Sequence, residues 1–136
     1  MKRLNLILLV DDDETTNYLN KRLLNNLDIA ASIEVATNGE EALKFLQSNH
    51  AAGNANPELI LLDIKMPVMD GFEFLEEYDQ LPAELKNCVL VMMLTSSASF
   101  YDLERLKQYN TVQRHISKPL QESHIKEIME TYFPEQ

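Results

Sequence analysis

Five short apolar runs alternate with amphipathic segments, and this alternation restricts the fold more than any other feature of the sequence. Near-continuous apolar runs are typical of strands that are covered on both faces. The segments between the runs carry apolar residues at helical spacing. Strict alternation of strand and helix favours an α/β fold, in which a five-stranded parallel sheet has helices on both faces. We expect one domain over residues 1–136.

The pattern predicts the position of each element. The expected strands are Leu4–Val10, Ser32–Ala36, Leu59–Leu62, Cys88–Leu94 and Thr111–Ile116. The expected helices are Thr15–Leu27, Asn38–Gln47, Gly71–Tyr78, Ala98–Tyr109 and Gln121–Tyr132. The leucines of the first helix, which form its expected apolar face, are Leu19, Leu23, Leu24 and Leu27. Gly, Asn and Pro residues predict a loop at Ala51–Pro57.

A run of acidic residues, Asp11 to Glu14, follows the first strand directly. Two unit charges about 4 Å apart repel by roughly 4 kcal/mol at an effective dielectric near 20, so this crowding needs an explanation. The aspartates could cap the first helix, because carboxylates stabilise a helix N-terminus. Alternatively, a divalent cation could lower their repulsion at a strand end that is open to solvent. The run alone leaves both explanations open.

Chemically distinctive residues follow the carboxyl ends of the other strands, where ligands bind in sheets of this class. They are Asp63 after the third strand, Thr95 after the fourth and Lys118 after the fifth. Carboxylates from two strand ends make an oxygen-only site, which suits Mg2+ because that ion takes one or two carboxylates and bridges to phosphate oxygens. The three histidines and Cys88 show no metal-ligand spacing, which disfavours zinc.

A lysine and a hydroxyl that face a cation site suggest a phosphoryl group. Lys118 would place a point charge on one phosphoryl oxygen, and Thr95 would donate a hydrogen bond to another. These contacts, together with Mg2+, are the electrostatic parts of phosphoryl transfer. Asp63 is the best acceptor because it stands alone on the central strand, and attack by it gives an aspartyl phosphate. Each residue alone could be an ordinary cap or turn residue, but their combination favours the site.

The overall charge restricts the partners. The net charge is −10 and the isoelectric point about 4.6, which disfavours nucleic acid and anionic membrane as partners because both are polyanions. A single cysteine, Cys88, excludes an internal disulfide and is interpreted as a buried hydrophobe. No apolar run reaches the ~18 residues of a membrane span, and no cleavage site follows the first run. We expect a cytoplasmic protein.

Four motifs together resemble those of the receiver domain of bacterial two-component response regulators. They are LLVDDD, LLDIKMPVMDG, MMLTSS and ISKPL, and the resemblance covers about residues 4–132. It implies a flavodoxin-like fold with strand order 2-1-3-4-5. It also implies a stand-alone receiver, because no output domain is expected after residue 132.

The resemblance implies a role for each residue of the metal site. Asp63 matches the phosphoacceptor and Asp12 the direct Mg2+ ligand. Asp11 matches a residue that reaches the metal through water, and the backbone carbonyl of Lys65 matches the third protein ligand. We also consider that the Lys65 side chain shields the acyl phosphate from water, with a solvated rim lysine as the equal alternative.

The remaining matches concern the phosphoryl group and the switch. Thr95 and Lys118 match the two residues that contact the phosphoryl group, and Thr95 is also a switch residue. The bond between Lys118 and Pro119 matches one that is typically cis, and Pro119 and Gly71 are expected to be structural. The second switch position usually holds Tyr or Phe but is His115 here. This residue is either a pH-tuned switch or a surface histidine.

The resemblance also implies partners. The phosphoryl donor would be a phosphohistidine on a sensor histidine kinase or on a histidine phosphotransfer protein. The output surface would be helix 4, strand 5 and helix 5, roughly Ala98–Tyr132, which would bind a downstream protein target or form a homodimer. Whether the chain passes the phosphoryl group onward or ends the pathway stays open.

Two other functions fit part of the sequence. The stretch LILLVDDDET matches the D-x-D-x-T signature of haloacid-dehalogenase-like phosphatases, with Asp11 as nucleophile and Asp13 as general acid. Those enzymes need a late acidic pair for magnesium, which is missing near the later strand ends, and they do not explain DIKMPVMDG. The third possibility is a receiver-like interaction module that is not phosphorylated.

Overall fold

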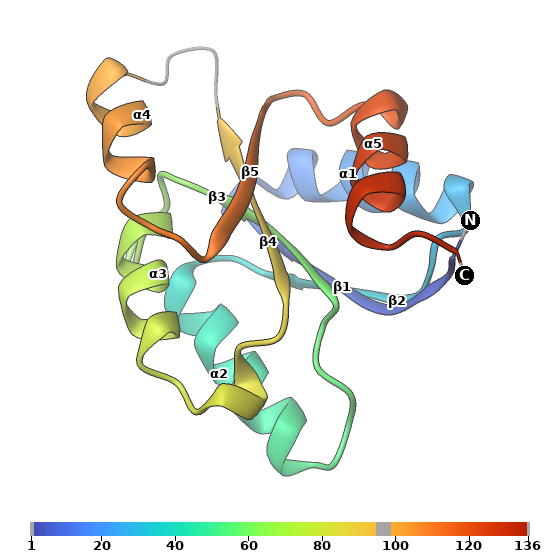
Figure 1. Ribbon diagram of the computed structural model, residues 1–136, viewed down its shortest axis with the longest axis horizontal. Coiled ribbons are helices and arrows are strands. Elements are labelled where there is room, and N and C mark those ends of the chain that lie inside the picture. The colour runs from blue at the N-terminus through green and yellow to red at the C-terminus, as the bar shows by residue number, and fades with distance from the viewer. Residues whose placement is uncertain (1, 95–98, 136) are drawn as a thin grey trace.

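Parallel strands and α-helices alternate, five of each, over residues 2–94 and 99–135, which the computed structural model describes (Figure 1). The strands are β1 Leu4–Val10, β2 Ala30–Ala36, β3 Leu59–Asp63, β4 Val89–Leu94 and β5 Val112–Ser117. The helices are α1 Glu14–Leu27, α2 Gly39–Ala51, α3 Gly71–Asp79, α4 Phe100–Leu106 and α5 Glu122–Tyr132. The sheet order is β2-β1-β3-β4-β5, which confirms the predicted flavodoxin-like fold.

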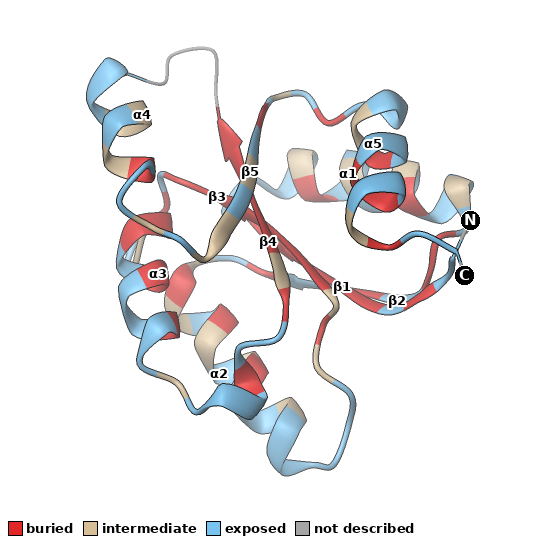
Figure 2. Cartoon of the chain, in the orientation of Figure 1, coloured by how far each residue is buried: buried red, intermediate tan, exposed pale blue. Residues whose placement is uncertain are grey.

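The helices form a layer on each face of the sheet, with α1 and α5 on one side and α2, α3 and α4 on the other (Figure 1). Alternate residues of the central strands enter two separate cores. Leu8, Ile60 and Met92 pack with α2 and α3, whereas Leu9 and Leu61 pack with α1 and α5. The central strands are buried on both faces, while edge strands β2 and β5 are partly exposed (Figure 2). This double burial produces the continuous apolar runs of the sequence.

Several predicted boundaries were wrong by a few residues. Helix α2 continues past Gln47 to Ala51, and β2 begins two residues before Ser32. The prediction for α4 was too long. This helix ends at Leu106, and the next residues form turns with hydrogen bonds of the i to i+3 type, which tighten a helix end. The predicted start of α4, Ala98, lies outside the described residues.

One leucine of α1, Leu19, does not pack into the core, although its helical spacing predicted that it would. Leu23, Leu24 and Leu27 pack into it, but Leu19 is 53% exposed. Leu19 lies near the N-terminal end of the helix and lines a small cleft of about 250 Å³ with Pro119 and Leu120. Helical spacing alone does not distinguish a residue at the margin of an apolar stripe from one at its centre.

The C-terminal end of α4 is attached to α3 by aromatic and charged side chains. The Arg105 guanidinium lies 4.3 Å from the centre of the Phe72 ring, which in turn lies 5.8 Å from the ring of Tyr109. The Tyr109 hydroxyl donates a hydrogen bond of 3.0 Å to Glu76, and Arg105 lies 3.7 Å from the same carboxylate. These contacts hold one end of α4 in place.

Candidate functional site

The strand register brings Asp11 and Asp63 together at the carboxyl edge of the sheet. Val10 pairs with Leu62, so the residue after Val10 lies beside the residue after Leu62. Both aspartates are buried, with 5% and 6% of their surface exposed, while Asp12 is exposed. Carboxylate oxygens of these three aspartates lie within 4.8 Å of one another. This oxygen-only cluster fits the predicted Mg2+ ligands, because hard divalent cations prefer oxygen donors.

The third aspartate of the run has a different task. Asp13 is the N-cap of α1, and its carboxylate accepts hydrogen bonds from the backbone N–H of Thr16, at 3.2 Å, and from the Thr16 hydroxyl. The side-chain and backbone hydrogen bonds from Thr16 lower the pKa of Asp13. Asp13 therefore caps the helix, as the first explanation of the acidic run predicts. Asp11 and Asp12 lie in the acidic cluster, where the cation explanation stays a prediction.

Lys118 connects the two buried aspartates. Its Nζ lies 2.8 Å from Asp11 Oδ2 and 3.1 Å from Asp63 Oδ1. The Lys118 backbone N–H donates to the Leu94 carbonyl at 2.7 Å, which fixes the end of β5, and the following bond to Pro119 is cis as predicted. We expected strand ends open to solvent, and this is wrong for Asp11 and Asp63. Their two charges are partly offset by the half-buried ammonium group of Lys118.

The environment shifts the ionisation of both partners. Burial is the main cause that raises the pKa of Asp63, the neighbouring Asp11 charge adds to it, and Lys118 opposes it. Burial lowers the pKa of Lys118, but the hydrogen bond from its ammonium group to Asp11 and the charge of Asp63 outweigh burial and raise it overall. The negative charge of Asp63 is therefore incompletely compensated, and a bound cation would stabilise the ionised carboxylate.

The loop from β3 to α3 is held tightly under the site. Asp70 and Glu73 form a capping box at the start of α3. The Gly71 backbone N–H donates to the Ile64 carbonyl at 2.7 Å, and a Cβ on Gly71 would lie 2.3 Å from the Asp63 carbonyl oxygen. No side chain fits such a contact, so Gly71 lets α3 approach the backbone of the predicted acceptor.

The same loop contains a residue with unfavourable backbone geometry. Val68 has a φ of 69° and is exposed, and the Met69 N–H donates to the Pro67 carbonyl at 2.8 Å across it. A positive φ is rare for a β-branched residue. The next residue ties this loop to α2, because the Gly39 N–H donates to the Met69 carbonyl at 2.9 Å.

Most of the predicted site residues meet. Asp11, Asp12, Asp63 and Lys118 converge, and the exposed Lys65 follows Asp63 by two residues. The prediction for Thr95 falls on a residue that lies outside the described part of the chain.

Sequence reasoning missed Asn17, which is buried beside this cluster. Its side-chain amide donates a hydrogen bond of 2.8 Å to the Asp11 carbonyl. The available signal was an asparagine seven residues before Leu24, which places a polar side chain on the core-facing side of α1.

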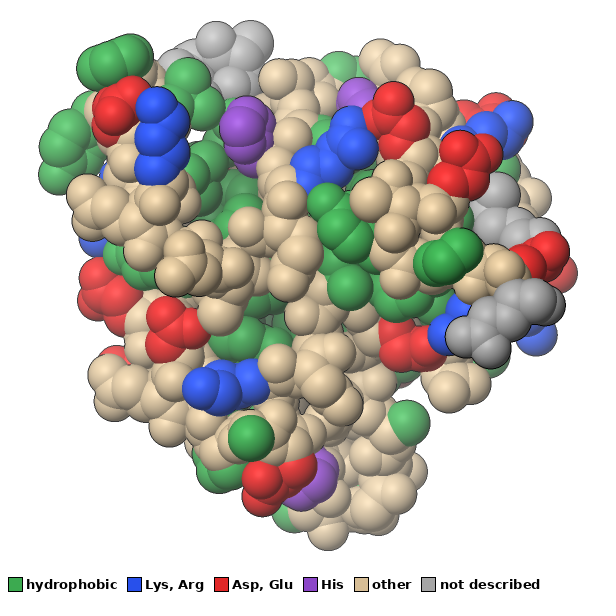
Figure 3. All heavy atoms as spheres, in the orientation of Figure 1, with side chains coloured by type: hydrophobic (Ala, Val, Ile, Leu, Met, Phe, Trp, Pro, Cys, Tyr) green, Lys and Arg blue, Asp and Glu red, His purple; other side chains and the backbone are tan. Residues whose placement is uncertain are grey.

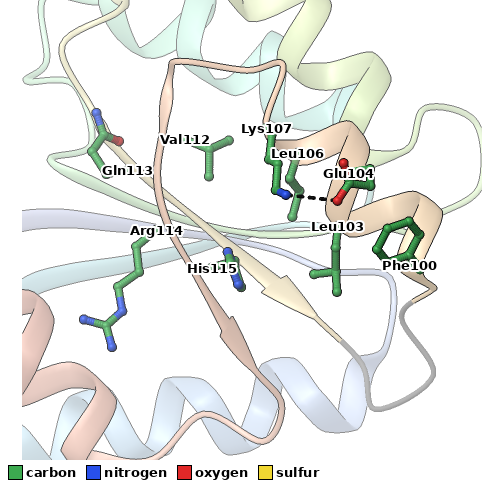
Figure 4. Close-up of a pocket in the computed structure, with 9 residues that line it drawn as sticks. All are labelled: Phe100, Leu103, Glu104, Leu106, Lys107, Val112, Gln113, Arg114 and His115. Carbon is green, nitrogen blue, oxygen red and sulfur yellow. Dashed lines mark hydrogen bonds and ion pairs between the residues drawn. The ribbon is translucent and has the colours of Figure 1, made fainter.

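His115 lies on the surface of β5, in a groove of about 420 Å³ between β5 and α4 (Figure 4). Leu103, Leu106 and Val112 give this groove an apolar lining, and Phe100 at its end is 76% exposed. Figure 3 shows hydrophobic side chains exposed over α4 and in the hollow beside it. The position agrees with a surface histidine, and the pH-switch hypothesis stays a prediction.

Among residues 2–94 and 99–135, no helix combines the length and the apolar character needed to span a bilayer.

Known proteins are similar to this chain in sequence and in fold. A family model described as the response regulator receiver domain matches residues 7–130. The probable methanogenesis regulatory protein FilR2 of Methanothrix harundinacea is 32% identical over 92% of this chain and 79% of that protein. The response regulator Rcp1 of Synechocystis is 36% identical over 67% of this chain and 62% of its own length, so the match to it spans less than two thirds of that relative.

A solved structure matches almost the whole length of this chain. The crystal structure of a two component response regulator from Cytophaga hutchinsonii has a TM-score of 0.86 and 27% identity, and the match covers 98% of this chain and all of that one. A response regulator receiver protein from Dyadobacter fermentans has a TM-score of 0.81 and 26% identity over 96% of this chain and 98% of the other.

Proposed function

The chain belongs to the response regulator receiver domain family, and from this membership we propose that it accepts a phosphoryl group on Asp63. Receiver domains of this family accept phosphoryl groups on an aspartate and bind Mg2+ at an acidic pocket. They pair with histidine kinases or phosphotransfer proteins. We further propose that residues 1–136 form a single receiver domain, as the match over residues 7–130 suggests.

The convergence of one ammonium group and three carboxylates at the sheet edge carries this proposal. Lys118 lies within 3.1 Å of Asp63, so a charge that can meet a phosphoryl oxygen is already beside the acceptor. Asp12 and Asp63 are the carboxylates that would hold Mg2+ directly, and Asp11 would reach it through a water. The backbone carbonyl of Lys65 is the proposed third protein ligand. A bound Mg2+ would supply positive charge against the oxygens of the transferring group.

The proposed transfer needs one nucleophile and one cation from the chain itself. An Asp63 carboxylate oxygen attacks phosphorus, a P–O bond forms, and the P–N bond to the donor's histidine breaks, with the electron pair passing to the imidazole nitrogen. Lys118 donates a hydrogen bond to a phosphoryl oxygen and balances part of the added charge. Thr95 is proposed to donate a second hydrogen bond.

The proposed output surface includes the groove between α4 and β5. Its apolar lining, from Leu103, Leu106 and Val112, suits a protein partner, either a downstream target or a second copy of the chain. The groove also contains the Glu104–Lys107 ion pair and His115 (Figure 4). Arg114 points away from α4 (Figure 4). It forms an ion pair with Glu127, which joins β5 to α5.

Mapping the modified residue tests the proposed function. Purified protein treated with acetyl phosphate and Mg2+ should gain one phosphoryl group on Asp63, detected by mass spectrometry after reductive trapping. Asp63→Asn should lose the modification, whereas Asp13→Asn should keep it because Asp13 caps α1. Modification of Asp11 instead would indicate the phosphatase chemistry.

A second measurement separates an active receiver from an interaction module that is not phosphorylated. Beryllofluoride with Mg2+ mimics the aspartyl phosphate, so it should raise the melting temperature of the wild type and not that of Asp63→Asn. If the wild type shows neither modification nor this shift, the proposed acceptor function is wrong.

A further inference from the structure

We propose that Asn17 is a positioning residue of the cation site, which holds the main chain of Asp11 in the arrangement that binds Mg2+. This inference rests on the proposed function, because it assumes that Asp11 and Asp12 are cation ligands. Asn17 itself lies on α1 and is not one of the predicted site residues.

Asn17 is buried to the same degree as the two buried aspartates of the site. In the described ranges 2–94 and 99–135, the buried polar or charged residues are Asp11, Asn17 and Asp63. Asn17 is 7% exposed, which is close to the values of the two aspartates. Polar side chains are buried at a cost unless they make hydrogen bonds, so a buried asparagine beside two buried carboxylates requires a reason.

The contacts of Asn17 concentrate on the turn that carries the aspartates. Its side-chain Nδ2 donates to the Asp11 carbonyl at 2.8 Å, and its backbone N–H donates to the Asp13 carbonyl at 3.0 Å. The N–H of Asp11 donates to the Ala36 carbonyl at 3.1 Å. Both peptide groups of Asp11 are therefore held, one by the end of β2 and the other by Asn17.

A second observation points toward a ligand. The other side-chain atom of Asn17, Oδ1, is buried and has no hydrogen-bond partner within the described part of the protein. An unpaired buried acceptor destabilises the folded protein, so fixing the Asp11 carbonyl does not by itself explain an asparagine. Mg2+ keeps several of its waters when it binds proteins, and their O–H groups are donors. A water on a bound Mg2+ would supply the donor that Oδ1 lacks.

The expected effect follows from how supporting residues act at metal sites. Residues that orient the ligands typically change metal affinity by about 10- to 100-fold when they are replaced. Asn17→Leu keeps a similar volume, suits the apolar side of α1 and removes both the donor and the unpaired acceptor. We expect the Kd for Mg2+, measured by titration calorimetry, to rise about 10-fold or more.

The matched control is Asn26→Leu, which makes the same change at an exposed position of the same helix. Its Kd for Mg2+ should equal that of the wild type. Melting temperatures without Mg2+ are measured in parallel, because a purely structural role would change stability and leave the Kd unaltered. If Asn17→Leu does not fold, Asn17→Ser is the second variant, since it removes less hydrogen-bonding capacity.

The outcomes separate the two proposals. A wild-type Kd in either folded Asn17 variant would overturn the positioning role, whatever happens to the melting temperature. Failure of both variants to fold would also overturn it, because Asn17 would then support the fold rather than the site. If the wild type itself binds no Mg2+, the proposed function fails first and this inference fails with it.

Discussion

The buried carboxylate of Asp63 shares one ammonium group with Asp11, so two negative charges face a single positive one. This imbalance has an energetic consequence in the protein without Mg2+. A raised pKa in the folded state means that the folded protein holds the Asp63 proton at a pH where the unfolded chain has released it. Stability is therefore lost as pH rises through this range, and the ionised Asp63 destabilises the fold at neutral pH.

We accordingly expect Asp63→Asn to be more stable than the wild type at pH 7 without Mg2+, because the amide has a similar shape and no charge. The difference should shrink as the pH is lowered from 7 to 4, because protonation removes the charge of the wild-type carboxylate. Urea unfolding at pH 7 and at pH 4 measures this difference in the free energy of unfolding. Asp79→Asn, at an exposed position, is the control and should change little. Lower stability of Asp63→Asn at pH 7 would show that the ion pair with Lys118 dominates.

The side chain of Lys65 bears on the lifetime of the proposed acyl phosphate. It is exposed and follows the acceptor by two residues. If it shields the phosphoryl group from water, Lys65→Ala should lose phosphate faster. An exposed charge interaction of about 0.5–1 kcal/mol corresponds to about a two- to fivefold change in rate. The rate is followed by phosphate release after acetyl phosphate is removed, with Lys44→Ala as the control. A wild-type rate in Lys65→Ala would reject shielding and leave a solvated rim lysine.

At the scale of elements, the contact between α3 and the end of β3 supports the site. The helix reaches the backbone of Asp63 only because Gly71 has no side chain. The capping box of Asp70 and Glu73 fixes where α3 begins, so the helix cannot shift along its axis without losing these hydrogen bonds.

Gly71→Ala is therefore expected to be strongly destabilising, by about 2–3 kcal/mol, because the new Cβ must displace backbone atoms. The comparison is Gly53→Ala, where φ is 81° and nothing lies within 4 Å of the new Cβ. This second change should cost only about 1 kcal/mol, from the left-handed conformation alone. Chemical denaturation of both variants tests whether Gly71→Ala is the more destabilising change. Equal losses would mean that the close approach of α3 is easily relaxed.

The sequence predicted elements best where burial leaves the clearest pattern. Strand β1 was predicted to the residue because it is covered on both faces, while the end of α2 at Ala51 was missed because His50 and its neighbours carry no strong stop signal. The site residues Asp63 and Lys118 could be predicted because parallel strands end at one edge. The contact of Asn17 with Asp11 could not, because it depends on how α1 is rotated over the sheet.

At the scale of the whole molecule, two apolar cores hold the sheet between its helices. The core that includes α3 contains two groups that ionise only at high pH. Burial raises the pKa of the Cys88 thiol to about 11, against a small opposing effect of Tyr78. Burial also raises the pKa of Tyr78, whose hydroxyl accepts a hydrogen bond of 3.4 Å from the Cys88 N–H.

This core should make the fold sensitive to alkali. The unfolded thiol ionises near pH 9, whereas the folded one keeps its proton to about pH 11, so stability falls as pH rises between these values. The loss from Cys88 is about 2–3 kcal/mol over that interval. Cys88→Ala should therefore lose less stability than the wild type between pH 8.5 and about 10.5 in urea titrations. Parallel curves for the two proteins would show that the thiol is not the responsible group.

The attachment of α4 to α3 has a mechanical consequence. Arg105 and Tyr109 fasten the C-terminal end of the helix to Phe72 and Glu76, while Phe100 at the other end projects into solvent. If α4 moves while these contacts are kept, the helix must rotate about its C-terminal end near Arg105. The largest displacement then occurs at its N-terminal end, which carries Phe100.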